Sequence, residues 1–111
     1  MDIAEWRQQI DALDRQLVEI LNERCRCAQE IGHLKRGQAL PVYEPDREKT
    51  IYDNVARLNQ GPLSTRALRH IYERIIDEMR AIQKYEALTD DTSAAGKHSA
   101  SAGRPGGDSG R

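Results

Sequence analysis

Apolar residues alternate at spacings of three and four through the first third of the chain. The repeat is interrupted once, at Arg24, and its members are Ile3, Trp6, Ile10, Leu13, Leu17, Ile20, Cys27, Ile31 and Leu34. This spacing predicts one long helix, from Ile3 to Arg36, with a narrow apolar seam for another helix. At about 1.5 Å per residue it is about 50 Å long, longer than a globule of this size is wide. We therefore expect the helix to reach into a partner chain.

Two shorter helical patterns follow, each bounded by residues typical of turns. The second segment starts at Pro45, which suits a first helical turn, and runs to about Leu58. Ser64 is a candidate N-cap for the third segment, whose apolar stripe consists of Leu68, Ile71, Tyr72, Ile75, Ile76, Met79 and Ile82. No stretch of any length alternates with period two, so we expect no sheet. The sequence predicts an all-α fold of three helices, most simply paired as a dimer.

Composition divides the chain into two parts. Residues 89–111 contain no large apolar side chain and are dominated by Gly, Ser and Ala. Such a segment cannot bury enough surface to offset the entropy that ordering would cost. We predict a helical domain over residues 1–88 and a disordered tail over residues 89–111.

Charge and hydropathy narrow the class of protein. The formal net charge is −1, with 17 basic and 18 acidic residues, which argues against a general nucleic-acid surface. The charged N-terminal sequence lacks the apolar region of a signal peptide, and no run of about 18 apolar residues exists to span a membrane. We expect a cytoplasmic protein that contacts neither nucleic acid nor membrane.

The two cysteines predict neither a disulfide nor a metal site. Cys25 and Cys27 are two positions apart on a predicted helix, so their side chains point about 200° apart. With His33 they match no standard zinc spacing. The sequence also has no Ser/His/Asp or Cys/His constellation and no glycine-rich phosphate loop. We predict reduced thiols and no cofactor.

The interruption at Arg24 is the first indication of a binding site. Lys35 lies eleven residues later, and eleven steps of about 100° return to within about 20° of the same direction. Gln83 adds a polar group to the apolar stripe of the third segment. Each residue alone has an ordinary interpretation, as an ion-paired, snorkelling or solvated side chain. Two cations on one face of a small domain instead indicate that an anion neutralises them.

Several motifs in order resemble the all-helical class of chorismate mutases. They are the run WRQQIDALDRQLVEILNERCRCAQEIGHLKR, then PVYEPDRE, then IIDEMRAIQ, and together they cover about residues 3–86. The family pattern places its functional residues at Arg7, Arg24, Lys35, Glu44, Arg47, Glu48 and Gln83 of this chain. The resemblance implies an intertwined homodimer that rearranges chorismate to prephenate, on the route to phenylalanine and tyrosine, without metal or redox cofactor.

The resemblance also implies a role for each residue. Arg24 and an Arg7 supplied by the partner subunit bind the two substrate carboxylates, while Lys35 and Gln83 donate hydrogen bonds to the ether oxygen. Glu48, with the region of Glu44, receives the ring hydroxyl, and Arg47 supports Glu48 or the carboxylate electrostatics. Helix geometry independently favours the sharing, because Arg7 lies about 26 Å along its own helix from Arg24.

One position departs from the family pattern. Four residues before Gln83 the family often has a serine that assists a substrate carboxylate, and this chain has Met79, which cannot donate that hydrogen bond. Two alternatives to a mutase stay open. One is an isochorismate–pyruvate lyase, which has a similar cationic site, and the other is a non-catalytic helical dimer that regulates another shikimate-pathway enzyme.

Overall fold

The computed structural model describes residues 1–92, and side chains as far as residue 85. It contains three helices and, within those residues, no strand: α1 (Ile3–Gly37), α2 (Pro45–Leu58) and α3 (Thr65–Thr92). The predicted all-α fold is confirmed, and the bounds of α1 and α2 agree with the sequence prediction to within a residue. α3 continues four residues beyond the predicted domain boundary at 88, and residues 93–111 of the predicted tail lie outside the described part. No helix of that part is long and apolar enough to cross a membrane.

Local signals in the sequence account for the helix ends. At the start of α1, Asp2 accepts from the backbone N–H of Glu5 and the Glu5 carboxylate accepts from the N–H of Asp2, a reciprocal capping box. α2 begins with Pro45 and carries acidic residues in its first turn, where they complement the helix dipole. Ser64 caps α3 as predicted, because its Oγ accepts from the N–H of Ala67 at 3.0 Å.

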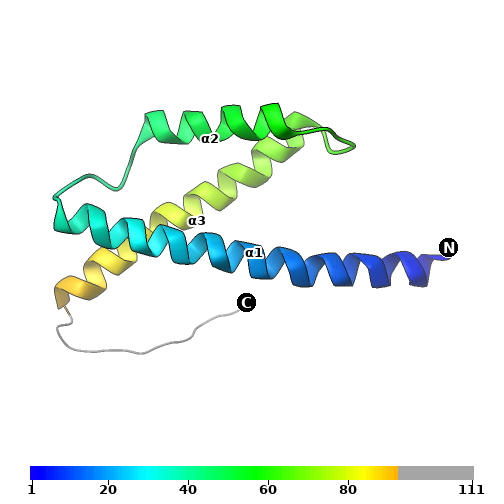
Figure 1. Ribbon diagram of the computed structural model, residues 1–111, viewed down its shortest axis with the longest axis horizontal. Coiled ribbons are helices and arrows are strands. Elements are labelled where there is room, and N and C mark those ends of the chain that lie inside the picture. The colour runs from blue at the N-terminus through cyan, green and yellow to red at the C-terminus, as the bar shows by residue number, and fades with distance from the viewer. Residues whose placement is uncertain (93–111) are drawn as a thin grey trace.

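The three helices form an open arrangement in which α3 starts beside the end of α2, diverges from it and crosses α1 (Figure 1). α3 packs against both α1 and α2, whereas α1 and α2 make no close backbone contact with each other in the described residues. α3 meets α1 closely at Gly32, where an added Cβ would lie 3.2 Å from the Cα of Gln83. The contact on α1 therefore uses Ala28 and Gly32, both buried, rather than the predicted seam residue Leu34, which is exposed.

A single chain buries little apolar surface. Its buried apolar side chains, among the described residues, are Ala28 and Ile76, and no large side chain is fully buried. The N-terminal half of α1 projects beyond the other helices (Figure 1), and more than half of the surface of each of its seam residues is exposed: Ile3, Trp6, Ile10, Leu13, Leu17 and Ile20. The seam predicted from the sequence is present, and no side chain among residues 1–85 covers it.

Candidate active site

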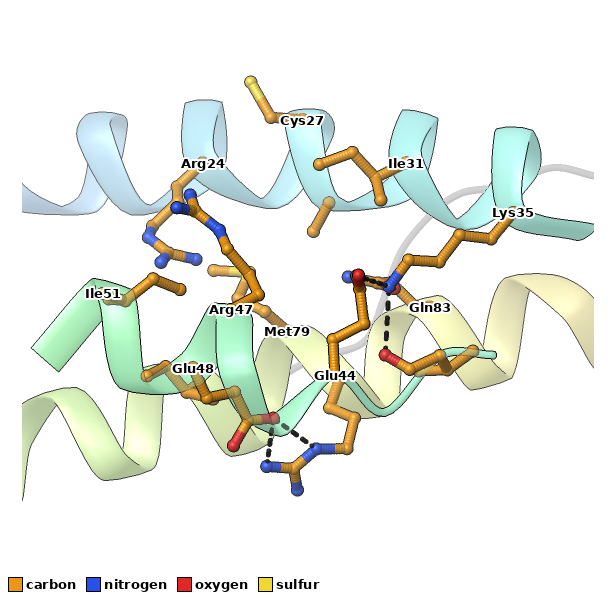
Figure 2. A pocket seen from close by; sticks show the side chains of 14 residues that line it. Arg24, Cys27, Ile31, Lys35, Glu44, Arg47, Glu48, Ile51, Met79 and Gln83 are labelled. Atoms are coloured by element: carbon orange, nitrogen blue, oxygen red, sulfur yellow. Dashed lines mark hydrogen bonds and ion pairs between the residues drawn. The ribbon is translucent and has the colours of Figure 1, made fainter. Parts of the chain in front are cut away.

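A cavity of about 390 Å³ lies between the C-terminal half of α1, the first turns of α2 and the distal part of α3 (Figure 2). α1 and α2 both pack on α3 and not on each other, and the cavity occupies the space between them. Six of the seven site residues predicted from the sequence line it, namely Arg24, Lys35, Glu44, Arg47, Glu48 and Gln83. The three-helix fold thus brings together residues that are up to 59 positions apart, 83 − 24, in the sequence.

Lys35 is the buried charge of this cavity, with 8% of its surface exposed. Its Nζ donates to the carbonyl oxygen of Val42 at 3.0 Å and to Oε1 of Gln83 at 3.1 Å, and it pairs with Oε1 of Glu44 at 2.6 Å. An ammonium has three N–H groups, so these three acceptors use all of them. The Glu44 side chain is half exposed, at 49%, and sits at the open side of the arrangement.

The contact with Lys35 fixes the orientation of the Gln83 amide. Because a lysine ammonium can only donate, Gln83 must turn its oxygen toward Lys35, and its Nε2 with two N–H groups is then free to face elsewhere. Gln83 and Met79 line the cavity from the same face of α3 (Figure 2). The cavity therefore holds an amide donor beside an ammonium, and a thioether one turn away.

Arg24 and Arg47 enter the cavity from opposite sides. Figure 2 shows Arg24 extending from α1 and Arg47 from α2, with their guanidinium groups toward each other. Among residues 1–85, no carboxylate forms an ion pair with either group; the ion pairs at the cavity belong to Lys35 and Arg80. Two unpaired guanidinium groups facing one cavity make a site for an anion that can accept from both.

Sequence reasoning missed a further cation, Arg80. Its Nε and Nη2 both donate to Oε2 of Glu48, at 3.0 and 2.7 Å, and its Nη1 donates to Asp77 at 3.3 Å. The same guanidinium lies 5.3 Å from the centre of the Tyr43 ring. The hydrogen bond with Glu48 is the main cause that raises the pKa of Arg80 above its ordinary value. The one available signal was spacing, since Arg80 precedes Gln83 by three residues and shares its helix face.

Charges on the cavity wall do not cancel. The lining includes four cations and two carboxylates, which leaves a formal charge of 4 − 2 = +2 from Arg24, Lys35, Arg47 and Arg80 against Glu44 and Glu48. No group of three or more His, Cys, Asp or Glu side chains in the described part of the chain could hold a metal ion. The arrangement is suited to binding a small dianion by charge and by directed N–H donors.

Arg7 is the one predicted site residue that the fold of a single chain does not bring to the cavity. It is exposed on the projecting half of α1, and 17 residues of helix place it about 26 Å along the axis from Arg24. A contribution from Arg7 therefore requires a second chain.

Comparisons with known proteins agree with this geometry. The chorismate mutase type II family matches residues 6–84. The chain is 36% identical over 87 residues to the bifunctional chorismate mutase/prephenate dehydratase of Aquifex aeolicus, covering 75% of this chain and 24% of that protein. It is 29% identical over 83 residues to the chorismate mutase of Methanocaldococcus jannaschii, covering 74% of this chain and 84% of the other.

A solved structure shows the same architecture. The chorismate mutase of Helicobacter pylori, in complex with prephenate, superposes with a TM-score of 0.71 at 30% identity, covering 79% of this chain and 94% of that one. Against bifunctional relatives such as the Aquifex protein, this chain spans about a quarter of their length. The matched region includes every predicted site residue, and the chain belongs to the chorismate mutase type II family.

Proposed function

We propose that this chain is a chorismate mutase, an isomerase that converts chorismate to prephenate. The supporting observation is the cavity with two unpaired guanidinium groups beside the Lys35–Gln83 pair. Chorismate carries two carboxylates, and its charge of −2 complements the +2 of the cavity wall. The proteins from Methanocaldococcus jannaschii and Helicobacter pylori are both chorismate mutases, which supports the same substrate.

The chemistry needs positioning and electrostatics rather than a nucleophile. In this rearrangement the ether C–O bond of chorismate breaks while a C–C bond forms within the same molecule, so no atom is gained or lost. The catalyst holds the two reacting ends together and stabilises negative charge that develops on the ether oxygen. Arg24 and Arg47 bind carboxylate, and Lys35 and the free amide N–H groups of Gln83 donate to the ether oxygen.

Lys35 must exchange one partner before it can act in this way. Its three N–H groups are taken in the free chain, by Val42, Gln83 and Glu44. The Val42 carbonyl is backbone and Gln83 is set by α3, whereas Glu44 is a half-exposed side chain. In the proposed mechanism the substrate displaces the Glu44 carboxylate from Lys35, and Glu44 then becomes available to the ring hydroxyl.

The proposed enzyme is a homodimer that shares its sites. The exposed seam on α1 supports this assembly, because a second copy offers an equivalent apolar surface to cover it. An antiparallel α1 from the partner would bring its Arg7 toward the Arg24 end of the cavity and add a cation for a substrate carboxylate. The cytoplasmic location expected from the sequence remains a prediction.

Turnover of purified protein tests the proposal. We expect the protein to convert chorismate to prephenate, which is measured as a loss of chorismate absorbance. We expect no reaction with isochorismate. Lys35→Ala should lower kcat by about 100-fold, because one preorganised donor to the developing oxyanion contributes about 3 kcal/mol. Lys49→Ala is the matched control, since Lys49 is an exposed lysine of α2 whose partner is Asp53.

Three outcomes would contradict the proposal in different ways. Pyruvate and salicylate from isochorismate would identify a lyase with the same fold. No reaction with either substrate would indicate a non-catalytic helical protein. If Lys35→Ala forms prephenate at the wild-type rate, the proposed reaction is correct but the role given to Lys35 is wrong.

A further inference from the structure

We propose that Arg80 is a positioning residue for this reaction, which orients the Glu48 carboxylate and neutralises it beside a dianionic substrate. The inference rests on the proposed function and assigns a role to a residue that the family pattern does not include. It comes from the geometry of the Arg80–Glu48 pair and from the charge balance of the cavity.

The two residues meet in a fixed and asymmetric way. Both Nε and Nη2 of Arg80 donate to one oxygen of Glu48, Oε2, at 3.0 and 2.7 Å. The side chains are 27% and 20% exposed, so the pair is partly shielded from water and holds its geometry better than a surface pair. A carboxylate can accept about four hydrogen bonds, so Glu48 keeps acceptor capacity on Oε1 for a substrate hydroxyl.

Arg80 is itself held from two other sides. Asp77, one turn earlier on α3, accepts from its Nη1 at 3.3 Å, and the Tyr43 ring lies 5.3 Å from its guanidinium carbon. Tyr43 belongs to the connection between α1 and α2, and Glu48 belongs to the first turns of α2. The guanidinium of Arg80, on α3, therefore contacts both the connection and α2 at the wall of the cavity.

Charge explains why a cation is needed at this position. An ionised Glu48 beside a substrate of charge −2 repels it, and the repulsion grows where water is excluded. Without Arg80 the cavity wall has three cations against two carboxylates, a formal charge of +1. Arg80 lets Glu48 remain an acceptor for the hydroxyl while the local charge of the pair is zero.

Kinetics of five variants, one of them a double variant, test this role. Arg80→Met should raise KM for chorismate about tenfold, because a hydrogen-bonded charge is removed and Glu48 then repels the substrate. Arg80→Lys should keep KM near the wild-type value, since the charge is retained, but should lower kcat, since lysine cannot hold Glu48 with two nitrogens. In the Glu48→Gln background, Arg80→Met should have little further effect on KM. Arg74→Met is the matched control, because Arg74 pairs with Glu78 on the exposed side of α3.

The alternative is a clamp that only joins α2 to α3. A clamp would lower the melting temperature of Arg80→Met and leave KM unchanged in the folded fraction. Each variant is therefore assayed at a temperature where circular dichroism shows that it is folded. If Arg80→Met does not fold, the inference is tested with Arg80→Lys and Glu48→Gln. If the wild-type protein converts chorismate and Arg80→Met has an unchanged KM, the inference about Arg80 is wrong, while the proposed function stands. An inactive wild-type protein would overturn the proposed function and this inference with it.

Discussion

The two halves of α1 carry different chemistry on the same face of one helix. From Ile3 to Ile20 the seam is continuously apolar and exposed, while from Arg24 to Lys35 it contains cations and lines a cavity against α2 and α3. Among residues 1–85, no apolar side chain covers the first half, and no carboxylate pairs with Arg24 in the second. The difference supports the proposal that a second chain covers the N-terminal half and that a small dianion binds at the C-terminal half.

The largest expected effect comes from placing a charge on the apolar half. Leu17→Asp should abolish dimerisation and reduce helical content, because an unpaired carboxylate in a buried interface costs several kcal/mol. Gln8→Asp is the matched control, since nine steps of about 100° place position 8 on the opposite side of α1 with the same change in charge. Sedimentation and circular dichroism measure both results, and a stable dimer of Leu17→Asp would show that the apolar half is not the interface.

Mixed dimers give an intermediate effect and test whether the two halves serve one site. Arg7→Ala and Arg24→Ala should each lose nearly all activity alone. When the two variants are unfolded and refolded together, half of the dimers are mixed, and each mixed dimer has one site with both arginines intact. Activity should therefore recover to about one quarter of the wild-type value. No recovery, in a mixture shown to contain mixed dimers, would mean that Arg7 does not act across the interface.

The smallest expected effect concerns the packing of the polar half on α3. Gly32→Ala places a Cβ 3.2 Å from the Cα of Gln83, and a backbone atom can move away only if the helices separate slightly. Overpacking of this kind costs about 1–3 kcal/mol, against about 1 kcal/mol gained in helix propensity. We expect little net change in stability but a several-fold lower kcat, because Gln83 shifts. Gly37→Ala, with nothing within 4 Å, should leave kcat unchanged, and equal activity of the two variants would refute the close-packing argument.

Local rules explain why the helices were predictable. Each signal depends only on neighbouring residues: the spacing of apolar residues predicts α1, Pro45 predicts the start of α2, and Ser64 predicts the start of α3. The structure has all three helices at these places. The cationic site was also accessible, because Arg24 and Lys35 share a helix face and the family pattern supplies the rest. The role of each site residue stays a prediction, as does the homodimer.

Contacts between distant segments explain what the sequence did not reveal. Arg80 and Glu48 are 32 positions apart on different helices, so no periodicity connects them. α3 packs on Gly32 rather than on Leu34 because a small residue lets the two helix backbones approach closely. A pattern of hydrophobic residues does not predict such a close approach. The saturation of the three Lys35 donors likewise depends on where the connection before α2 places Val42 and Glu44.

The unpaired guanidinium groups of Arg24 and Arg47 have a consequence for product release in the proposed reaction. An isomerisation keeps both carboxylates, so the product would leave the cavity with the same charge that draws the substrate in. Electrostatic attraction alone cannot distinguish the two molecules, and every gain in substrate capture through these cations also slows product release. Selection for turnover in such a site acts on shape and on the ether-oxygen donors, while the strength of the charge sets how strongly accumulated product inhibits the enzyme.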